Sequence, residues 1–167
     1  LLFSLMYICG YFILPTTDTL GYGFGIYKAN LLTLFDPIPY NSIQNWSILI
    51  PDIQNTFGEH EGFSYIGLGG IILLFFLAQF IIKNPNLVIK NVKYIYLILL
   101  FFILSLSNNI SISDKELISI NLPNYLYAPL SIIRASGRFI WIVSYLIIIF
   151  SLIALIKYKL KKRYFIL

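Results

Sequence analysis

Long runs of apolar residues alternate with polar, aromatic-rich segments along this chain. The runs cover residues 1–14, 63–82, 94–107 and 139–156. Runs of eighteen to twenty residues, such as the second and fourth, match the roughly 30 Å of a bilayer core. The third run reaches only about 21 Å as a helix, so it needs residues 91–93 to extend it. We therefore predict four transmembrane helices, over about 1–14, 63–82, 92–107 and 139–157.

Composition favours a membrane protein. Charged residues make up 11% of the chain and the mean hydropathy is +0.83, whereas soluble domains are about 25% charged. The predicted fold class is therefore all-α and integral to the membrane, with one domain over residues 1–167. The chain begins with Leu1 and contains a single Met, Met6, so we expect the first helix to be the end of one that starts upstream.

Charge is unevenly distributed between the segments that join the apolar runs. Basic residues follow the second and fourth runs, and the positive-inside rule places them in the cytoplasm. The segments 15–62 and 108–138 then form two non-cytoplasmic loops, and they contain every acid of the chain: Asp18, Asp36, Asp52, Glu59, Glu61, Asp114 and Glu116. The longer loop is rich in aromatic residues, so we predict that it is folded, with Tyr27, Phe35 and Trp46 buried.

Two arginines stand immediately before the fourth run, on the side that should be poor in basic residues. Arg134 and Arg138 are four residues apart, so a helix from Leu130 to Arg138 would place both on one face. Guanidinium groups suit bidentate binding of phosphate or carboxylate, and we predict an anion site supported by Glu61 and Asp52. The alternative is that both arginines extend to lipid headgroups, which composition alone favours.

Other motifs have weaker chemical implications. Glu59-His60-Glu61 could be an acid/base pair or part of a metal site, but a solvated charged turn is the favoured interpretation. One Cys, Cys9, and one His exclude a Cys/His metal cluster. The glycines of 21–25 have no strand before them, so a phosphate-binding loop is not favoured. We predict no metal, no cofactor and no nucleic-acid partner.

Several segments in succession resemble a known family. They are Asn30-Leu31-Leu32-Thr33-Leu34-Phe35-Asp36-Pro37, Trp46-Ser47, Leu49-Ile50-Pro51-Asp52, Glu61-Gly62-Phe63-Ser64-Tyr65-Ile66-Gly67, Ser107-Asn108 and Arg134-Ala135-Ser136-Gly137-Arg138-Phe139-Ile140-Trp141. The order is similar to that in a bacterial family of uncharacterised polytopic membrane proteins whose architecture resembles GT-C glycosyltransferases. The resemblance implies a multi-pass protein of the bacterial inner membrane.

The resemblance also implies a function. GT-C enzymes take sugars from polyprenyl-phosphate carriers, and their catalytic acid usually lies in an early non-cytoplasmic loop that would precede this sequence. The catalytic residue is therefore unassigned, and a lipid-linked phosphate is the expected ligand of Arg134 and Arg138. A non-catalytic component of cell-envelope assembly or polysaccharide export remains the alternative. A transporter is disfavoured because the apolar runs contain no charged residue.

Overall fold

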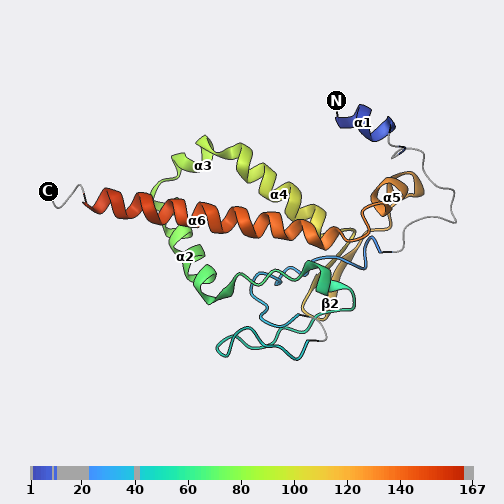
Figure 1. The fold of residues 1–167 in the computed structure, drawn as a ribbon, viewed down its shortest axis with the longest axis horizontal. Helices are drawn as coiled ribbons and strands as arrows, with labels where there is room; N and C mark the ends of the chain where they lie inside the picture. Colours follow the sequence, from blue (N-terminus) through green and yellow to red (C-terminus); the bar gives the residue numbers. More distant parts are fainter. Residues whose placement is uncertain (1, 9, 11–22, 40–41, 164–167) are drawn as a thin grey trace.

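The computed structural model describes residues 2–8, 10, 23–39 and 42–163 of the 167. Cys9 and residues 15–22 of the first predicted loop, which include Asp18, lie outside the described residues. The elements run in chain order (Figure 1): α1 (Leu2–Ile8), η2 (Glu59–Gly62), α2 (Gly67–Lys83), α3 (Asn86–Lys90), α4 (Val92–Leu106), β1 (Asn109–Ile112), β2 (Lys115–Ser119), α5 (Asn124–Ser131), η3 (Ser136–Arg138) and α6 (Phe139–Arg163).

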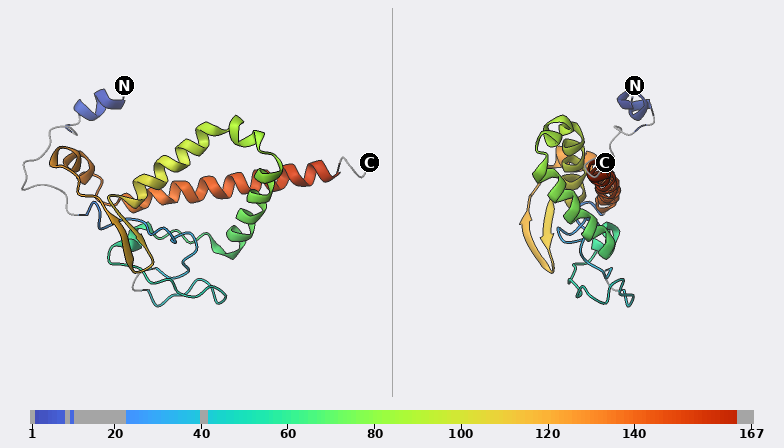
Figure 2. Two further views of the ribbon diagram at one scale, coloured as in Figure 1. Left: turned by 180° about the vertical axis from the view of Figure 1, so that it is seen from behind. Right: turned by 90° about the vertical axis from the view of Figure 1, so that its left-hand side faces the viewer.

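The long apolar helices α2, α4 and α6 pack together. Helices α2 and α4 both pack against α6, and the short α3 connects them at the end farthest from the β-hairpin (Figures 1 and 2). Helix α2 has no buried residue, although apolar side chains project from all of its faces. Large side chains such as Phe75, Leu100 and Ile149 are at least half exposed. In a helix of this kind, apolar side chains cover every face and are not confined to one stripe.

The prediction of an all-α fold with four spanning helices is wrong. The described residues include a two-stranded antiparallel sheet, and among them only Ser136–Lys157 is long and apolar enough to cross a membrane. Helix α2 has 17 residues and α4 has 15, which at ~1.5 Å per residue is short of a ~30 Å core. At the N-terminus the described helix covers only Leu2–Ile8.

The sheet is a hairpin inside the second predicted loop. Strand β1 pairs with β2 in antiparallel register, with an irregularity between Ile110 and Ser111. Ser113 at the turn has a φ of 55°. Every residue of β2 is exposed, whereas Ser111 of β1 is buried. Strand β2 still contacts the first loop, because Lys28 Nζ donates to Glu116 Oε1 at 3.3 Å. Helix α5 follows it and ends at Ser131.

The core lies where the first loop meets the beginning of α6. Ala29, Leu34, Ile140 and Val143 form its buried apolar cluster. The loop backbone is tied to α4 and the hairpin, because Ala29 N donates to Ser105 O (2.8 Å) and Leu31 N donates to Ser111 O (3.0 Å).

The predicted aromatic burial in the first loop is only partly correct. Tyr27 is half-buried, whereas Phe35 is 39% exposed and Trp46 is 65% exposed. Polar side chains hold this loop instead. Lys28, Asn30, Asp36 and Glu59 are all nearly inaccessible.

Candidate functional site

The two predicted arginines line one open cavity beside the start of α6. The cavity has a volume of about 550 Å³ and is lined by Tyr27, His60, Glu61, Arg134, Ala135 and Arg138. These residues come from three separate segments: the first loop, the 3-10 helix η2, and the turn between α5 and α6. The site therefore depends on tertiary packing and not on a single helix.

The two arginines do not share a helical face, so the predicted helix from Leu130 to Arg138 is wrong. Helix α5 ends at Ser131, and Ala135 has a φ of −119° and a ψ of 73°, which no α-helix accommodates. A 3-10 turn over Ser136–Arg138 then leads into α6. The turn nevertheless brings Arg134 and Arg138 to the same cavity.

Two glycines permit the close packing that fixes this turn. A β-carbon on Gly137 would lie 2.8 Å from the carbonyl carbon of Lys28 and 2.9 Å from Gly62 Cα. A β-carbon on Gly62 would lie 2.4 Å from Ala29 Cα. The backbone of Gly137 also donates a hydrogen bond to Tyr27 O (2.9 Å). These contacts hold the first loop, η2 and the beginning of α6 against one another.

Arg138 is paired with Glu61. Its Nε donates to Oε2 of Glu61 at 2.8 Å, with the arginine side chain 58% exposed and the glutamate side chain 26% exposed. The hydrogen bond from Arg138 lowers the pKa of the Glu61 carboxyl group. Glu61 is therefore an anion that orients Arg138 at the edge of the cavity.

Arg134 is held differently. Its guanidinium carbon lies 5.7 Å from the centroid of the Tyr27 ring, which is a cation–π contact. Among the described residues no carboxylate lies within ion-pair distance of Arg134. The Tyr27 ring also meets His60 edge to face, with centroids 5.9 Å apart. The sequence predicted neither Tyr27 nor His60 as a member of the arginine site.

Gly23, in the glycine-rich motif at 21–25, is required by close packing against Arg134. Its φ is 151°, and an added β-carbon would lie 2.7 Å from both Cγ and the carbonyl oxygen of Arg134. The glycine therefore lets the loop approach Arg134 closely. Residues 21 and 22 of the motif lie outside the described part of the chain.

Asp52 does not belong to this cavity. It is exposed in the first loop and does not line the site. Its charge acts on Asp36 instead, where it contributes to a raised pKa. Burial is the main cause of that raised pKa, and hydrogen bonds from Asn55 and Ile38 oppose it.

Glu59 lies in a buried polar cluster. The sequence favoured a solvated charged turn for its motif, which is wrong for this residue. It is 4% exposed. Oε2 accepts hydrogen bonds from Asn30 Nδ2 and Thr56 N, each at 2.9 Å, and Oε1 accepts one from Ser111 Oγ. Each carboxylate oxygen therefore has a protein donor, which offsets the cost of burying it.

No group of three or more His, Cys, Asp or Glu side chains that could hold a metal ion occurs among the described residues. No curated protein and no solved structure matched the chain. A family model matched it from residue 1 to residue 167, with the description Domain of unknown function (DUF6311). The chain belongs to the DUF6311 family.

Proposed function

We propose that this chain is part of a membrane protein that binds the phosphate of a polyprenyl-phosphate-linked sugar at the periplasmic surface of the bacterial inner membrane. The observation that supports it most directly is Arg134, which faces an open cavity without a carboxylate partner among the described residues. Arg138 lies in the same cavity with only one of its nitrogens on Glu61. A phosphate group would supply the missing negative charge.

The surroundings of α6 support membrane insertion. The segment Ser136–Lys157 is long and apolar enough to cross a bilayer, and large apolar side chains of α2 and α4 are exposed beside it. Such an apolar surface would be unfavourable in water and suits lipid. We propose that α6 spans the membrane and that α2 and α4 enter the bilayer beside it as a hairpin. The cavity then lies where α6 enters.

The resemblance to GT-C glycosyltransferases supports a role in sugar transfer. A lipid-linked donor has its phosphate at the membrane surface, which is the depth at which the arginine cavity would lie. The first step at this site is binding: the two guanidinium groups hold the phosphate, and Glu61 keeps one of them oriented. The acid or base for transfer is not among the assigned residues.

Binding of polyprenyl phosphate to the full-length protein in detergent tests this proposal. Arg134→Lys keeps the charge but removes the planar fork, so we expect roughly tenfold weaker binding from the loss of one charge-assisted hydrogen bond. The matched control is Arg163→Lys at the far end of α6. Equal affinity for polyprenol and polyprenyl phosphate would contradict the proposal, as would unchanged binding by Arg134→Lys.

Insertion is tested separately by cysteine labelling in intact cells, in a Cys9→Ser background. We expect Lys115→Cys at the exposed start of β2 to react with an impermeant reagent. Lys90→Cys on α3 should react only after the membrane is permeabilised. Labelling of both positions from outside would overturn the proposed orientation.

A further inference from the structure

Two adjoining cavities lie between the helices at the end of the molecule that contains α3. The larger has a volume of about 300 Å³, and its walls come from α2, α4, α6 and Asn91, the residue before α4; they include Phe80, Ile98, Ala154 and Lys157. The smaller, of about 40 Å³, shares Phe80 and Ala154 with it and adds Gln79 and Lys83. The walls are thus mainly apolar, with lysine at two edges.

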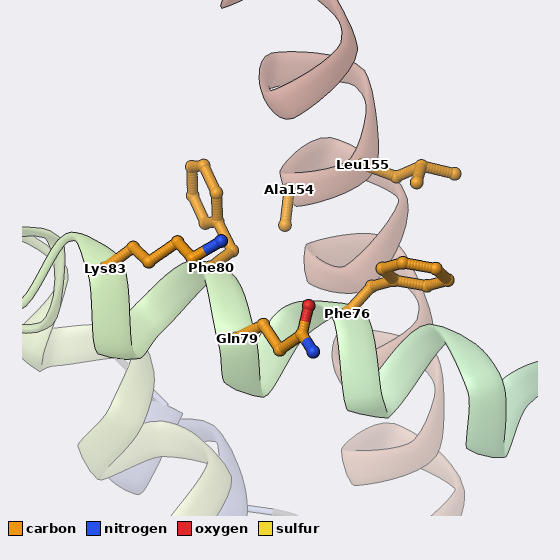
Figure 3. Close-up of a pocket in the computed structure, with 6 residues that line it drawn as sticks. All are labelled: Phe76, Gln79, Phe80, Lys83, Ala154 and Leu155. Carbon is orange, nitrogen blue, oxygen red and sulfur yellow. The ribbon is translucent and has the colours of Figure 1, made fainter.

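Figure 3 shows how the smaller cavity is built. Phe76, Gln79, Phe80 and Lys83 project from α2, and Ala154 and Leu155 belong to the facing part of α6. The Lys83 side chain bends back along α2 toward Phe80, so its ammonium group lies near the shared wall of the two cavities. Lys157 lines the larger cavity from α6 and is exposed.

The helices at this end supply only positive charge. Between Gly62 and Ser113, and again from Leu117 to the end of the chain, the sequence contains no Asp or Glu. The same stretches contain Lys83, Lys90, Lys93 and Lys157. An apolar cavity with a cationic edge is complementary to a molecule with a hydrocarbon chain and an anionic head. Basic pockets between membrane helices bind such lipids.

We propose that an anionic phospholipid occupies these cavities. One acyl chain would lie against the apolar walls of the larger cavity, and the phosphate would lie between Lys83 and Lys157. The site is separate from the arginine cavity, which lies at the other end of α6. This inference rests on the membrane insertion proposed above, and not on any role in sugar transfer.

Native mass spectrometry of the full-length protein tests the site. The protein is released from detergent in the presence of phosphatidylglycerol or of phosphatidylcholine with the same acyl chains. We expect phosphatidylglycerol to be retained preferentially. Lys83→Gln and Lys157→Gln should each weaken its binding roughly fivefold, from the electrostatic contribution of one lysine near a lipid surface. The matched control is Lys90→Gln, which removes the same charge from α3 but lines neither cavity.

A wall variant tests the apolar part of the site. Ala154→Leu places a larger side chain where the cavities join and should lower retention of phosphatidylglycerol. If that variant is less stable to heat than the wild type, Ile98→Phe is tested in its place, because it enlarges a side chain of α4 that lines the larger cavity.

The outcomes are distinct. Equal retention of the two lipids would overturn the site, since it would show no preference for an anionic headgroup. An effect of Lys90→Gln as large as those of the two cavity lysines would also overturn it, since it would indicate diffuse electrostatic attraction. If the protein stays in the membrane through a carbonate wash and shows no lipid preference, the site fails while insertion stands. Release by that wash would overturn both proposals.

Discussion

Replacing Gly137 by alanine should damage the junction that builds the arginine cavity. The added β-carbon would lie 2.8 Å from the carbonyl carbon of Lys28 and 2.9 Å from Cα of Gly62. All of these neighbours are backbone atoms, so no side-chain rotation can relieve the overlap. Overpacking of this kind costs about 1–3 kcal/mol. Movement of the turn would also weaken the 2.9 Å hydrogen bond from Gly137 N to Tyr27 O, worth about 0.5–1.5 kcal/mol.

The expected loss is therefore about 1.5–4.5 kcal/mol in the free energy of unfolding. For a domain of this size that corresponds to a fall in Tm of roughly 3–18 °C, measured by thermal unfolding in detergent. The control is Gly69→Ala in α2, where an added β-carbon meets no atom within 4 Å. Its effect should be neutral or slightly stabilising, because alanine is the better helix former. A Gly137→Ala protein as stable as the Gly69→Ala protein would refute the packing argument.

Three further predictions concern the site and its supporting loop. Tyr27→Leu should weaken phosphate binding about two- to fivefold, because it removes the cation–π contact of Arg134, whereas Tyr27→Phe retains an aromatic ring and should bind normally. Equal affinities of the two variants would show that the cation–π contact does not contribute to binding. The pKa of Glu61 is lowered by Arg138, so its stabilising effect is present above the unfolded value of 4.5 and fades as pH falls. The Tm difference between wild type and Glu61→Gln should therefore shrink below that pH, and a constant difference contradicts it. The pKa of Asp36 is raised by burial, so ionisation costs stability as pH rises. Asp36→Asn should accordingly gain Tm relative to wild type between pH 4 and pH 7, and a relative loss would show that the charge is favourable there.

Local chemistry in the sequence was enough to select the right residues around Arg138. Two arginines on the acidic side predicted an anion site with Glu61 and Asp52; the structure pairs Arg138 with Glu61 and leaves Asp52 outside the cavity. The geometry was not predictable from spacing alone. The backbone between Arg134 and Arg138 breaks from helical geometry at Ala135. The close approach of Gly137 to the first loop, distant in sequence, belongs to that nonhelical turn.

The hairpin was missed although the sequence contained a sign of it. Isoleucine alternates with polar residues over 109–112 and again near 117–120, on either side of Ser113-Asp114. That period of two indicates paired strands. Each strand has only four or five residues, so neither forms an apolar run, and a prediction based on apolar runs assigns this segment to a loop.

The burial of Glu59 shows what sequence could not supply. Its partners Asn30 and Ser111 are 29 and 52 residues away, so nothing adjacent to the carboxylate indicates where it points. In a 3-10 helix successive residues are about 120° apart, so Glu59 and Glu61 face in different directions. Glu59 is buried in the polar cluster, whereas Glu61 lines the cavity.

The different positions of Glu59 and Glu61 within η2 connect the buried polar cluster to the proposed phosphate site. Glu59 accepts hydrogen bonds from the first loop and from β1, so it fixes the position of η2 relative to both. Glu61 can then hold Arg138 at a defined place, because the hydrogen bonds of Glu59 fix the backbone of η2. Arg134 is positioned by a second contact to the same loop, through Tyr27. Both guanidinium groups therefore owe their placement to the first loop, and a ligand that contacts both would bind a surface whose geometry is already set before it arrives.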